Sequence, residues 1–471
     1  MKKNSISIFI SFSIMVIGTL LPSIGPVSDR GVSAIALVLA MVLLLAAQAL
    51  PIGVMCFLCI LAQPLMGITE SLSESASYWA NYLFFFVIMA FNIGLAFSNT
   101  TLPRRVLLFM LEHVKKDARG PVLAIWLTTA LLSGIIANFA VIALMLAFAW
   151  EYLSLFDDPV KKKKTGRCLL LGMCASTELG GNITPLGSSI NIMVINFLND
   201  CGFSISYAKW IGISLPLFVI LFFLMTRILF RMCPPEALSQ PKIQECIAAN
   251  QTLRPLSAKE KKLLAIVSVM MVLLLISPFI PELKSELIIV AAGILLMLPG
   301  IEVVKYDQLA KSEAFTQTIY ICCFIGLAGI LSSAGVVDVL TAGFQSMMPS
   351  RPSVFIVVAL LCVLTIVLCN FLPAAAVPSV LTVPMITFCA SVNIDPVLAV
   401  IPLAMCSNCS WILPLDPISL LTYGKGYYTL MDMVKPGLVL TAMTAAVTGG
   451  LDGPAVPASL TSSSSRKQHR R

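Results

Sequence analysis

The sequence predicts an all-α polytopic membrane protein with about 11 transmembrane helices, in which two re-entrant hairpins and two broken helices form an inverted repeat. Three observations predict this fold class. The 471-residue chain is 58% hydrophobic and 11% charged, with a mean hydropathy of +0.95, which leaves too little polar surface to cover a water-soluble globule. Several of its apolar runs are too short to cross a bilayer. One pattern around an asparagine occurs twice.

The duplicated pattern surrounds Asn138 and Asn370. Each asparagine follows a small residue, precedes a phenylalanine and lies five positions after a serine or threonine. A proline-containing motif comes after each copy, with Pro185 47 residues after Asn138 and Pro414 44 residues after Asn370. Interrupted apolar segments at corresponding positions of two halves indicate a secondary transporter with its binding site where the repeats meet.

The short apolar runs around these motifs predict how each half enters the membrane. A helix needs about 20 residues to cross a hydrocarbon core, so we expect re-entrant hairpins over 121–150 and 353–388, with the asparagines at their tips. We expect 168–198 and 393–424 to be single helices broken at a loop. Non-helical backbone at membrane depth is tolerated where protein or water satisfies its peptide groups, and such breaks line binding sites.

The remaining organisation follows from composition. The first apolar run begins Met-Lys-Lys and lacks a convincing cleavage site, which favours a retained helix over a cleaved signal peptide. An amphipathic stretch at 100–119 predicts either an interfacial helix or a basic loop. The predicted division of the chain is an N-terminal helix outside the repeat at 1–30, repeat one at 31–231, a cytoplasmic linker at 232–262, repeat two at 263–450 and a tail at 451–471.

The positive charges predict a multi-pass protein of the cell membrane with a cytoplasmic N-terminus. In this orientation 23 of the 31 lysines and arginines face the cytoplasm, as the positive-inside rule requires. The first hairpin then opens from the inside and the second from the outside. The basic tail is the exception, because an odd number of crossings places it outside. The net charge of +8 lies mainly in the cytoplasmic loops, so it indicates anchoring at the inner face and no nucleic-acid partner.

Enzymatic function is not expected. The chain has two histidines, His113 near a surface and His469 in the tail, which argues against a histidine-based metal site. It also lacks a close pair of carboxylates in the predicted bundle, and so it offers no set of nucleophile and base.

These motifs together resemble one known family. The two asparagine motifs, the loop Thr-Pro-Leu-Gly-Ser-Ser-Ile-Asn at 184–191 and the stretch Tyr-Gly-x-Gly-Tyr-x-Thr at 423–429 are similar to the divalent anion:sodium symporters of the ion transporter superfamily, over nearly the whole chain. The resemblance implies sodium-coupled transport of di- or tricarboxylates or sulfate by a homodimer. It also implies that each hairpin tip and the broken-helix loop of its own repeat hold a sodium ion, while the two tips share the anion.

The resemblance transfers roles to particular positions. It implies a first cation site at Ser133, Ala137, Asn138 and Gly187, and a second at Thr365, Cys369, Asn370 and Asp416. It implies substrate contacts from Asn138, Phe139, Asn370, Phe371, Ser188 and Pro417.

Both tips depart from the family pattern. Ala137 and Cys369 stand where the family has serine, and Phe139 and Phe371 stand where it has threonine. Aromatic surfaces replace hydroxyls that donate to a carboxylate, which favours a substrate with an apolar part over a compact dicarboxylate.

Two acidic residues leave the coupling ion open. Asp416 occupies the position of Gly187 in the other half, where it can ligate a cation, carry a proton or cap the following half-helix. Glu178 lies in an apolar, glycine-rich segment where the other half has Ser407. It is either a proton-coupling residue or a structural, hydrogen-bonded glutamate.

The predicted function is therefore a secondary active transporter that moves a di- or tricarboxylate or related organic anion with sodium, by alternating access. One alternative is a proton-coupled transporter or exchanger of a less polar anion that uses Asp416 and Glu178. Another is an uncoupled, channel-like permease. No cofactor is expected beyond the coupling sodium ions or protons.

Overall fold

The computed structural model describes most of the chain, and the regular elements in the described part are helices. The residues described are 2–23, 27–47, 49–77, 79, 82–115, 117–136, 138–203, 205–238, 255–280, 283–347, 354–370, 376–392, 394–409, 411–413 and 417–449. Most of the predicted linker and the whole predicted tail lie outside them.

The first half of the chain, up to the linker, forms eleven helices in its described residues. They are α1 (Lys2–Leu20), α2 (Asp29–Ala46), α3 (Ile52–Leu65), α4 (Leu72–Ser77), α5 (Tyr82–Ser98), α6 (Leu102–His113), α7 (Gly120–Ser133), α8 (Asn138–Ser154), α9 (Pro159–Gly181), α10 (Ser189–Asp200) and α11 (Tyr207–Met232).

The second half follows the linker and contains α-helices and one short 3-10 helix. They are α13 (Ala258–Ile276), η1 (Ser277–Phe279), α14 (Ser285–Leu295), α15 (Tyr306–Ala310), α16 (Glu313–Ser333), α17 (Val336–Met347), α18 (Val354–Cys369), α19 (Ala376–Ser391), α20 (Pro396–Ser407), α21 (Pro417–Tyr423) and α22 (Leu430–Gly449).

Few single helices are long enough to cross a membrane by themselves. Among the described residues, three helices are long and apolar enough, namely α11, α16 and α22, and the bent pair α5 and α6 meets the same criterion if it counts as one span. Many others are apolar helices of 10–17 residues, including α7, α18 and α20. That several of these runs end inside the membrane stays a prediction.

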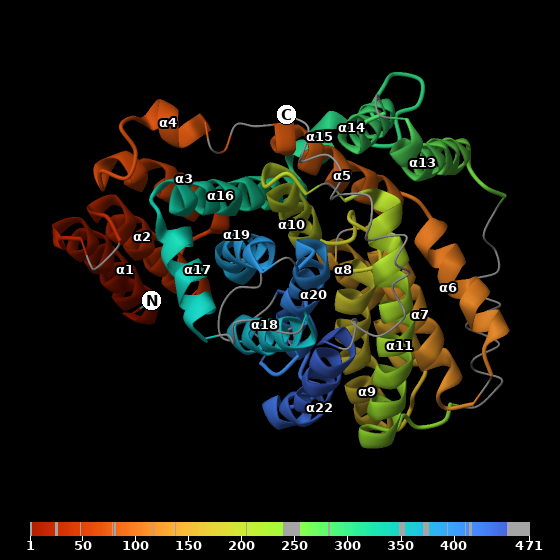
Figure 1. Cartoon of the computed structure of the whole chain (residues 1–471). Helices are drawn as coiled ribbons and strands as arrows, with labels where there is room; N and C mark the ends of the chain where they lie inside the picture. Colours follow the sequence, from red (N-terminus) through yellow and green to blue (C-terminus); the bar gives the residue numbers. More distant parts are fainter. Residues whose placement is uncertain are drawn as a thin grey trace.

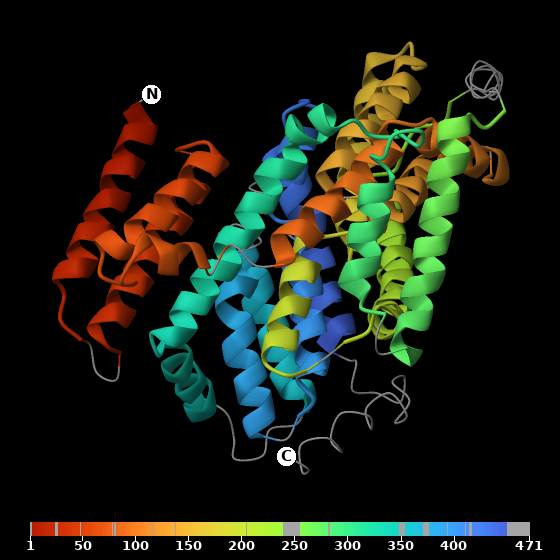
Figure 2. The ribbon, with the colours of Figure 1, turned by 90° about the horizontal axis from the view of Figure 1, so that it is seen from above.

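The helices pack into one body in which the two halves are interleaved. The α16 helix contacts α2, α3 and α5 of the first half and α17 and α19 of the second. Figures 1 and 2 show α1, α2 and α3 together at one end of the molecule, with α16 between them and the remaining helices. The α9 helix contacts α7, α8 and α11, and also α21 of the second half.

The first broken helix begins earlier than its apolar run. Asp158 caps α9 by accepting a hydrogen bond from the Val160 amide at 2.8 Å, and Pro159 occupies the first turn. The lysines at 161–164 belong to this helix. Lysine is a good helix former, and an Asp-Pro start is favourable, so hydropathy alone placed the beginning of the helix too late.

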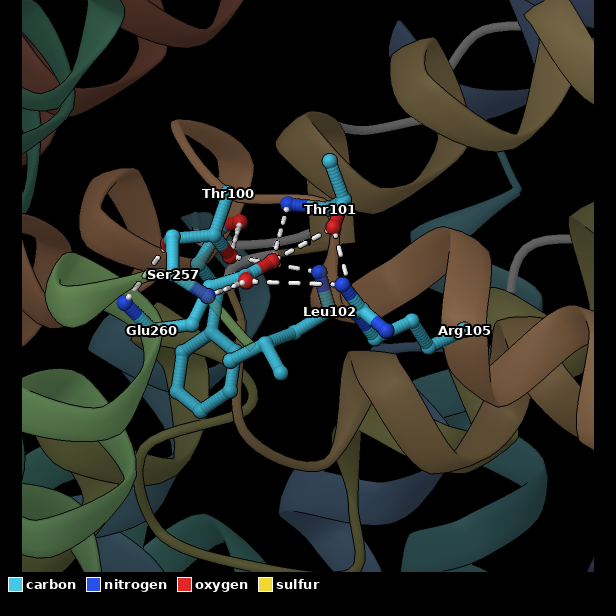
Figure 3. Close-up of polar contacts among 7 residues, drawn as sticks. Thr100, Thr101, Leu102, Arg105, Ser257 and Glu260 are labelled. Atoms are coloured by element: carbon cyan, nitrogen blue, oxygen red, sulfur yellow. Dashed lines mark hydrogen bonds and ion pairs between the residues drawn. The ribbon is translucent and has the colours of Figure 1, made fainter. Parts of the chain in front are cut away.

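The 100–119 stretch contains the helix α6, which bends by 60° from α5. A buried carboxylate from the second half occupies this bend (Figure 3). Glu260 accepts hydrogen bonds from the Thr101 hydroxyl at 2.5 Å and the Thr101 amide at 3.0 Å, both on Oε1. Its Oε2 accepts from the Ser257 amide at 2.8 Å and lies 3.6 Å from Arg105 Nη2. The start of α13 is thus joined to the start of α6.

These contacts keep Glu260 ionised. Burial by itself would raise the pKa of this carboxyl, but hydrogen bonds donated by Thr101 and Ser257 outweigh burial and lower the pKa to about 2. Glu260 lies in the polar first turn of α13, before the apolar part of that helix begins. The carboxylate is therefore a permanent structural charge over the physiological pH range.

Two ion pairs connect segments that are far apart in the sequence. Lys209 Nζ lies 3.8 Å from Asp395 Oδ2, and Arg167 Nη1 lies 3.0 Å from Asp432 Oδ1. The orientation of the chain in the membrane stays a prediction.

Candidate functional site

The first tip is the short connection between α7 and α8. Ser133 ends α7 and Asn138 begins α8, and the Ser133 hydroxyl lies 2.5 Å from Asn138 Oδ1 and 2.7 Å from the Thr177 carbonyl. A hydroxyl has one proton, so it donates to one of these oxygens at a time. Ala137, predicted to belong to this cation site, lies outside the described residues.

Glycines let the first tip touch the break between α9 and α10. A Cβ atom on Gly181 would lie 2.2 Å from Asn138 Oδ1, and a Cβ atom on Gly187 would lie 2.5 Å from the carbonyl oxygens of both Ser133 and Gly181. The Thr184 hydroxyl donates to the Gly134 carbonyl at 2.5 Å. The structure thus brings Ser133, Asn138 and Gly187 together among hydroxyl, amide and carbonyl oxygens.

The second tip lies at the end of α18. Asn370 Oδ1 accepts a hydrogen bond from the Ile412 amide at 3.0 Å, and Asn370 Nδ2 donates to the Ile366 carbonyl at 2.7 Å. Thr365 and Cys369 are buried, and the Thr365 hydroxyl has no hydrogen-bond partner among the described residues. The structure therefore places Asn370 against the break that follows α20.

Some predicted residues cannot be placed at this second tip. Phe371 and Asp416 lie outside the described residues, and for Phe139 and Pro417 the structure describes the helical backbone without the side chain. Their predicted roles as substrate and cation contacts stay predictions. The α21 helix, which begins at Pro417, contacts α8, which follows the first tip, and α9, which precedes the first break.

Three helix ends meet at a buried point between the two breaks. Asn182 is the C-cap of α9, Ser188 is the N-cap of α10 and Asn408 is the C-cap of α20. The Ser188 hydroxyl donates to Asn408 Oδ1 at 2.8 Å, and Asn408 Nδ2 donates to Asn182 Oδ1 at 2.7 Å. All three residues are buried. These contacts join the first half to the second through side chains.

The sequence did not predict the roles of Asn182 and Asn408. Each is an amide residue in an apolar stretch next to a break, which is the same signal that identified Asn138. The repeat does not mark these two asparagines, because Asn182 lies three residues before Pro185 whereas Asn408 lies six residues before Pro414. Asn191, within the motif at 184–191, donates to the carbonyls of Gly181 and Thr184 at 2.9 and 3.0 Å, and so it closes the loop of the first break.

Glu178 lies on α9 beside the first tip and is 1% exposed. The Cys174 thiol, one turn earlier, contacts its Oε1 at 3.8 Å. The preceding residue, Thr177, provides the carbonyl that Ser133 contacts. Ser407, which stands at the corresponding position of the second half, donates to the Leu403 carbonyl of its own helix at 2.8 Å. A buried carboxyl therefore lies next to one tip, and a hydroxyl stands at the corresponding position in the other half.

Comparisons with known proteins identify what this arrangement is similar to. A family model described as the sodium:sulfate symporter transmembrane region matches residues 2–451. An uncharacterized transporter of Methanocaldococcus jannaschii is 24% identical over 82% of this chain and 86% of its own length. The sodium-dependent dicarboxylate transporter SdcS of Staphylococcus saprophyticus is 22% identical over 89% of this chain and 85% of its own.

A solved structure shares the fold. The crystal structure of the YdaH transporter of Alcanivorax borkumensis superimposes with a TM-score of 0.52 over 83% of this chain and 89% of that chain. The sequences are 14% identical, so this likeness concerns the fold alone.

Proposed function

Because the chain belongs to the sodium:sulfate symporter family, a family of transporters and not of enzymes, we propose that it is a secondary active transporter that moves a small anion across the membrane with sodium. The family match confirms the resemblance to the divalent anion:sodium symporters. The observation that carries the proposal is the set of oxygen atoms from Ser133, Asn138 and the backbone around Gly187.

The proposed first cation site consists of Ser133, Ala137, Asn138 and Gly187, and the second of Thr365, Cys369, Asn370 and Asp416. Unwound backbone carbonyls and helix C-terminal ends coordinate coupling ions in broken-helix transporters. The Ser133 and Gly181 carbonyls that approach Gly187 are such groups. The Thr365 hydroxyl, which has no hydrogen-bond partner in the described part of the chain, supports the second site, because a buried hydroxyl is normally paired.

The proposed anion site lies between the two tips, at Asn138, Phe139, Asn370, Phe371 and Pro417. The α8 helix begins at Asn138, and the partial positive charge of a helix N-terminus attracts an anion. Ser188 was also expected to contact the anion. Its hydroxyl donates its proton to Asn408 in this structure, so that proton is not free to bind the anion.

The proposed transport cycle uses the two halves as an inverted repeat of opposite topology. The short pairs α7 with α8 and α18 with α19 act as re-entrant hairpins, and α9 with α10 and α20 with α21 act as the broken helices. Alternating access then moves the hairpin-bearing part relative to the rest of the protein. We also propose the cytoplasmic N-terminus and the homodimer that the sequence predicts.

Uptake into proteoliposomes tests this proposal. With an inward sodium gradient, the purified protein is expected to accumulate radiolabelled succinate or sulfate above the external concentration, and replacement of sodium by choline should abolish accumulation. Equilibration without accumulation under any gradient would instead indicate a channel-like permease and overturn the proposal.

A second candidate function is proton-coupled transport, and the burial of Glu178 favours it. A carboxyl that is 1% exposed beside the first tip is a candidate proton carrier, because ionisable residues within membrane segments are usually functional. In that case an inward proton gradient drives uptake without sodium, and Glu178→Gln abolishes the response to that gradient. If Glu178→Gln retains wild-type sodium-driven uptake and the wild type ignores pH gradients, Glu178 is structural.

A further inference from the structure

Asn408 connects the two halves of the proposed site. On the first-half side it contacts Asn182, which directly follows Gly181, the glycine packed against Asn138. On its own side it lies four residues before Ile412, whose amide holds Asn370. A displacement of Asn408 therefore reaches the first tip through Asn182 and Gly181. It reaches the second tip along the chain to Ile412, which donates to Asn370.

The carboxamide of Asn408 is fully used in this role. Its Oδ1 accepts from Ser188 at 2.8 Å, and its Nδ2 donates to Asn182 at 2.7 Å, with the Ala404 carbonyl at 3.2 Å as a second acceptor. The reverse orientation of the amide would place two oxygens against each other at Asn182, since Asn182 Nδ2 points to the Met405 carbonyl at 3.4 Å. The hydrogen bonds thus fix one orientation.

Ser188 has no proton left for an anion in this arrangement. Its oxygen accepts from the Ile190 amide at 3.3 Å as the N-cap of α10, and its hydroxyl proton goes to Asn408. A hydroxyl has a single donor. Ser188 therefore orients the start of α10 relative to α20, and its contact with the substrate stays a prediction.

We propose that Asn408 is a positioning residue that transmits cation binding between the two halves of the site, through Ser188 and Asn182. This inference rests on the proposed sodium-coupled function. Binding at the oxygen cluster around Gly187 fixes the segment 181–188, and Asn408 passes that constraint to the break that holds Asn370. Buried polar networks of this kind link two sites by fixing the relative position of rigid elements.

The measurable quantity is the factor by which sodium raises the apparent affinity for the anion. It is the ratio of the half-saturating succinate concentration at low sodium to that at saturating sodium, in proteoliposomes containing the full chain. Asn408→Ala is expected to lower this factor about 10-fold, within the range of ordinary allosteric couplings, while maximal uptake per folded protein changes less. Ser188→Ala should have a similar effect, and the double variant should be no worse than either single variant.

A matched control is Asn92→Ala. Asn92 is buried and its Nδ2 donates to the Gly293 carbonyl at 2.9 Å, which joins α5 to α14 outside this network. It should keep the wild-type factor. Because a purely structural defect lowers the amount of folded protein without changing the ratio, melting temperature in detergent is measured alongside.

The possible results separate the two proposals. If the wild type shows sodium-raised anion affinity but folded Asn408→Ala keeps the same factor, or if the single effects multiply in the double variant, the role of Asn408 is overturned and the transport function stands. If sodium drives uptake of none of a panel of anions that contains sulfate, succinate and larger organic anions, both proposals fall. If Asn408→Ala does not fold, Ser188→Ala and Asn182→Ala decide by the same ratio.

Discussion

The two tips have the same residue classes at the same spacing, yet their asparagines are held differently. At the first tip, Asn138 Oδ1 contacts the Ser133 hydroxyl, a side chain of the preceding helix. At the second, Asn370 bonds to backbone, with Ile412 as donor and Ile366 as acceptor. The difference teaches that sequence symmetry specifies the position of a group in the fold but not its partners. The position of Asn138 depends on a side chain that a mutation can remove, whereas the position of Asn370 depends on main-chain groups.

The largest expected effects come from removing the asparagines themselves. Asn138→Ala and Asn370→Ala should each lower sodium-driven succinate uptake by about 100-fold or more, because each removes a proposed ligand of both cation and anion. Asn370→Ala should also destabilise the protein by about 1 kcal/mol, since the part-buried Ile412 amide loses its acceptor.

Uptake and the thermal midpoint in detergent distinguish these two effects. Both variants should reach the membrane in normal amounts. Wild-type transport in both variants would contradict the assignment of the tips, and equal loss of thermal stability in both would contradict the contrast between them.

The next largest loss of sodium-driven uptake should come from a larger side chain at Gly181, next to the first tip. The new methyl group of Gly181→Ala would lie 2.2 Å from Asn138 Oδ1, so the asparagine side chain must move. We expect sodium-driven uptake to fall about 10-fold or more, because misplacement of a ligand by about 1 Å is costly. Gly212→Ala in α11, where a Cβ atom meets nothing within 4 Å, should transport normally.

When sodium is absent, removal of the hydroxyl at the first tip should lower the melting temperature, and removal of the hydroxyl at the second tip should raise it. Ser133→Ala should lower the melting temperature of sodium-free protein by about 1 °C, because a hydrogen bond worth about 1 kcal/mol is lost. Thr365→Val should raise it slightly, because this hydroxyl is buried without a partner among the described residues.

If the Thr365 hydroxyl ligates sodium, added sodium should reduce the rise in melting temperature that Thr365→Val causes. Melting curves with and without sodium at fixed ionic strength check this expectation. Stabilisation of Thr365→Val by sodium to the same extent as the wild type would remove Thr365 from the second cation site.

The last prediction concerns how pH changes the stability of the junction between α6 and α13, where Glu260 lies away from the two tips. The pKa of Glu260 is lowered to about 2, so its stabilising contribution is present above the unfolded-state pKa of about 4.3 and is lost as pH falls toward 2. The difference in melting temperature between wild type and Glu260→Gln should therefore stay constant from pH 5 to 8 and shrink below about pH 4. A difference that varied between pH 5 and 8 would contradict this pKa.

Helices in the structure end close to both asparagines and before both proline-containing motifs, because the signals for helix ends are local. Asparagine in an apolar run and prolines or glycines at the breaks each disturb a membrane helix where they stand. The start of α9 was placed too late because hydropathy does not detect a helix formed by lysines behind an Asp-Pro cap. The family match confirms the class of protein, whereas the residue roles at the tips remain predictions.

The contacts between the halves could not be predicted from local pattern. Asn408 meets Ser188 and Asn182 across 220 and 226 residues, and only the packed structure specifies such a pair. The asymmetric bonding of Asn138 and Asn370 is likewise a consequence of which backbone lies nearby. Sequence patterns identify groups that need partners, and packing selects the partners.

The junction at α6 also bears on how the chain is made. Thr101 and Glu260 are 159 residues apart, so the bend after α5 leaves the ribosome long before the carboxylate that occupies it. Until α13 is synthesised, the Thr101 amide and hydroxyl lack the carboxylate that accepts their hydrogen bonds in the folded protein. The start of α6 therefore reaches its final contacts only after the start of α13 has been made.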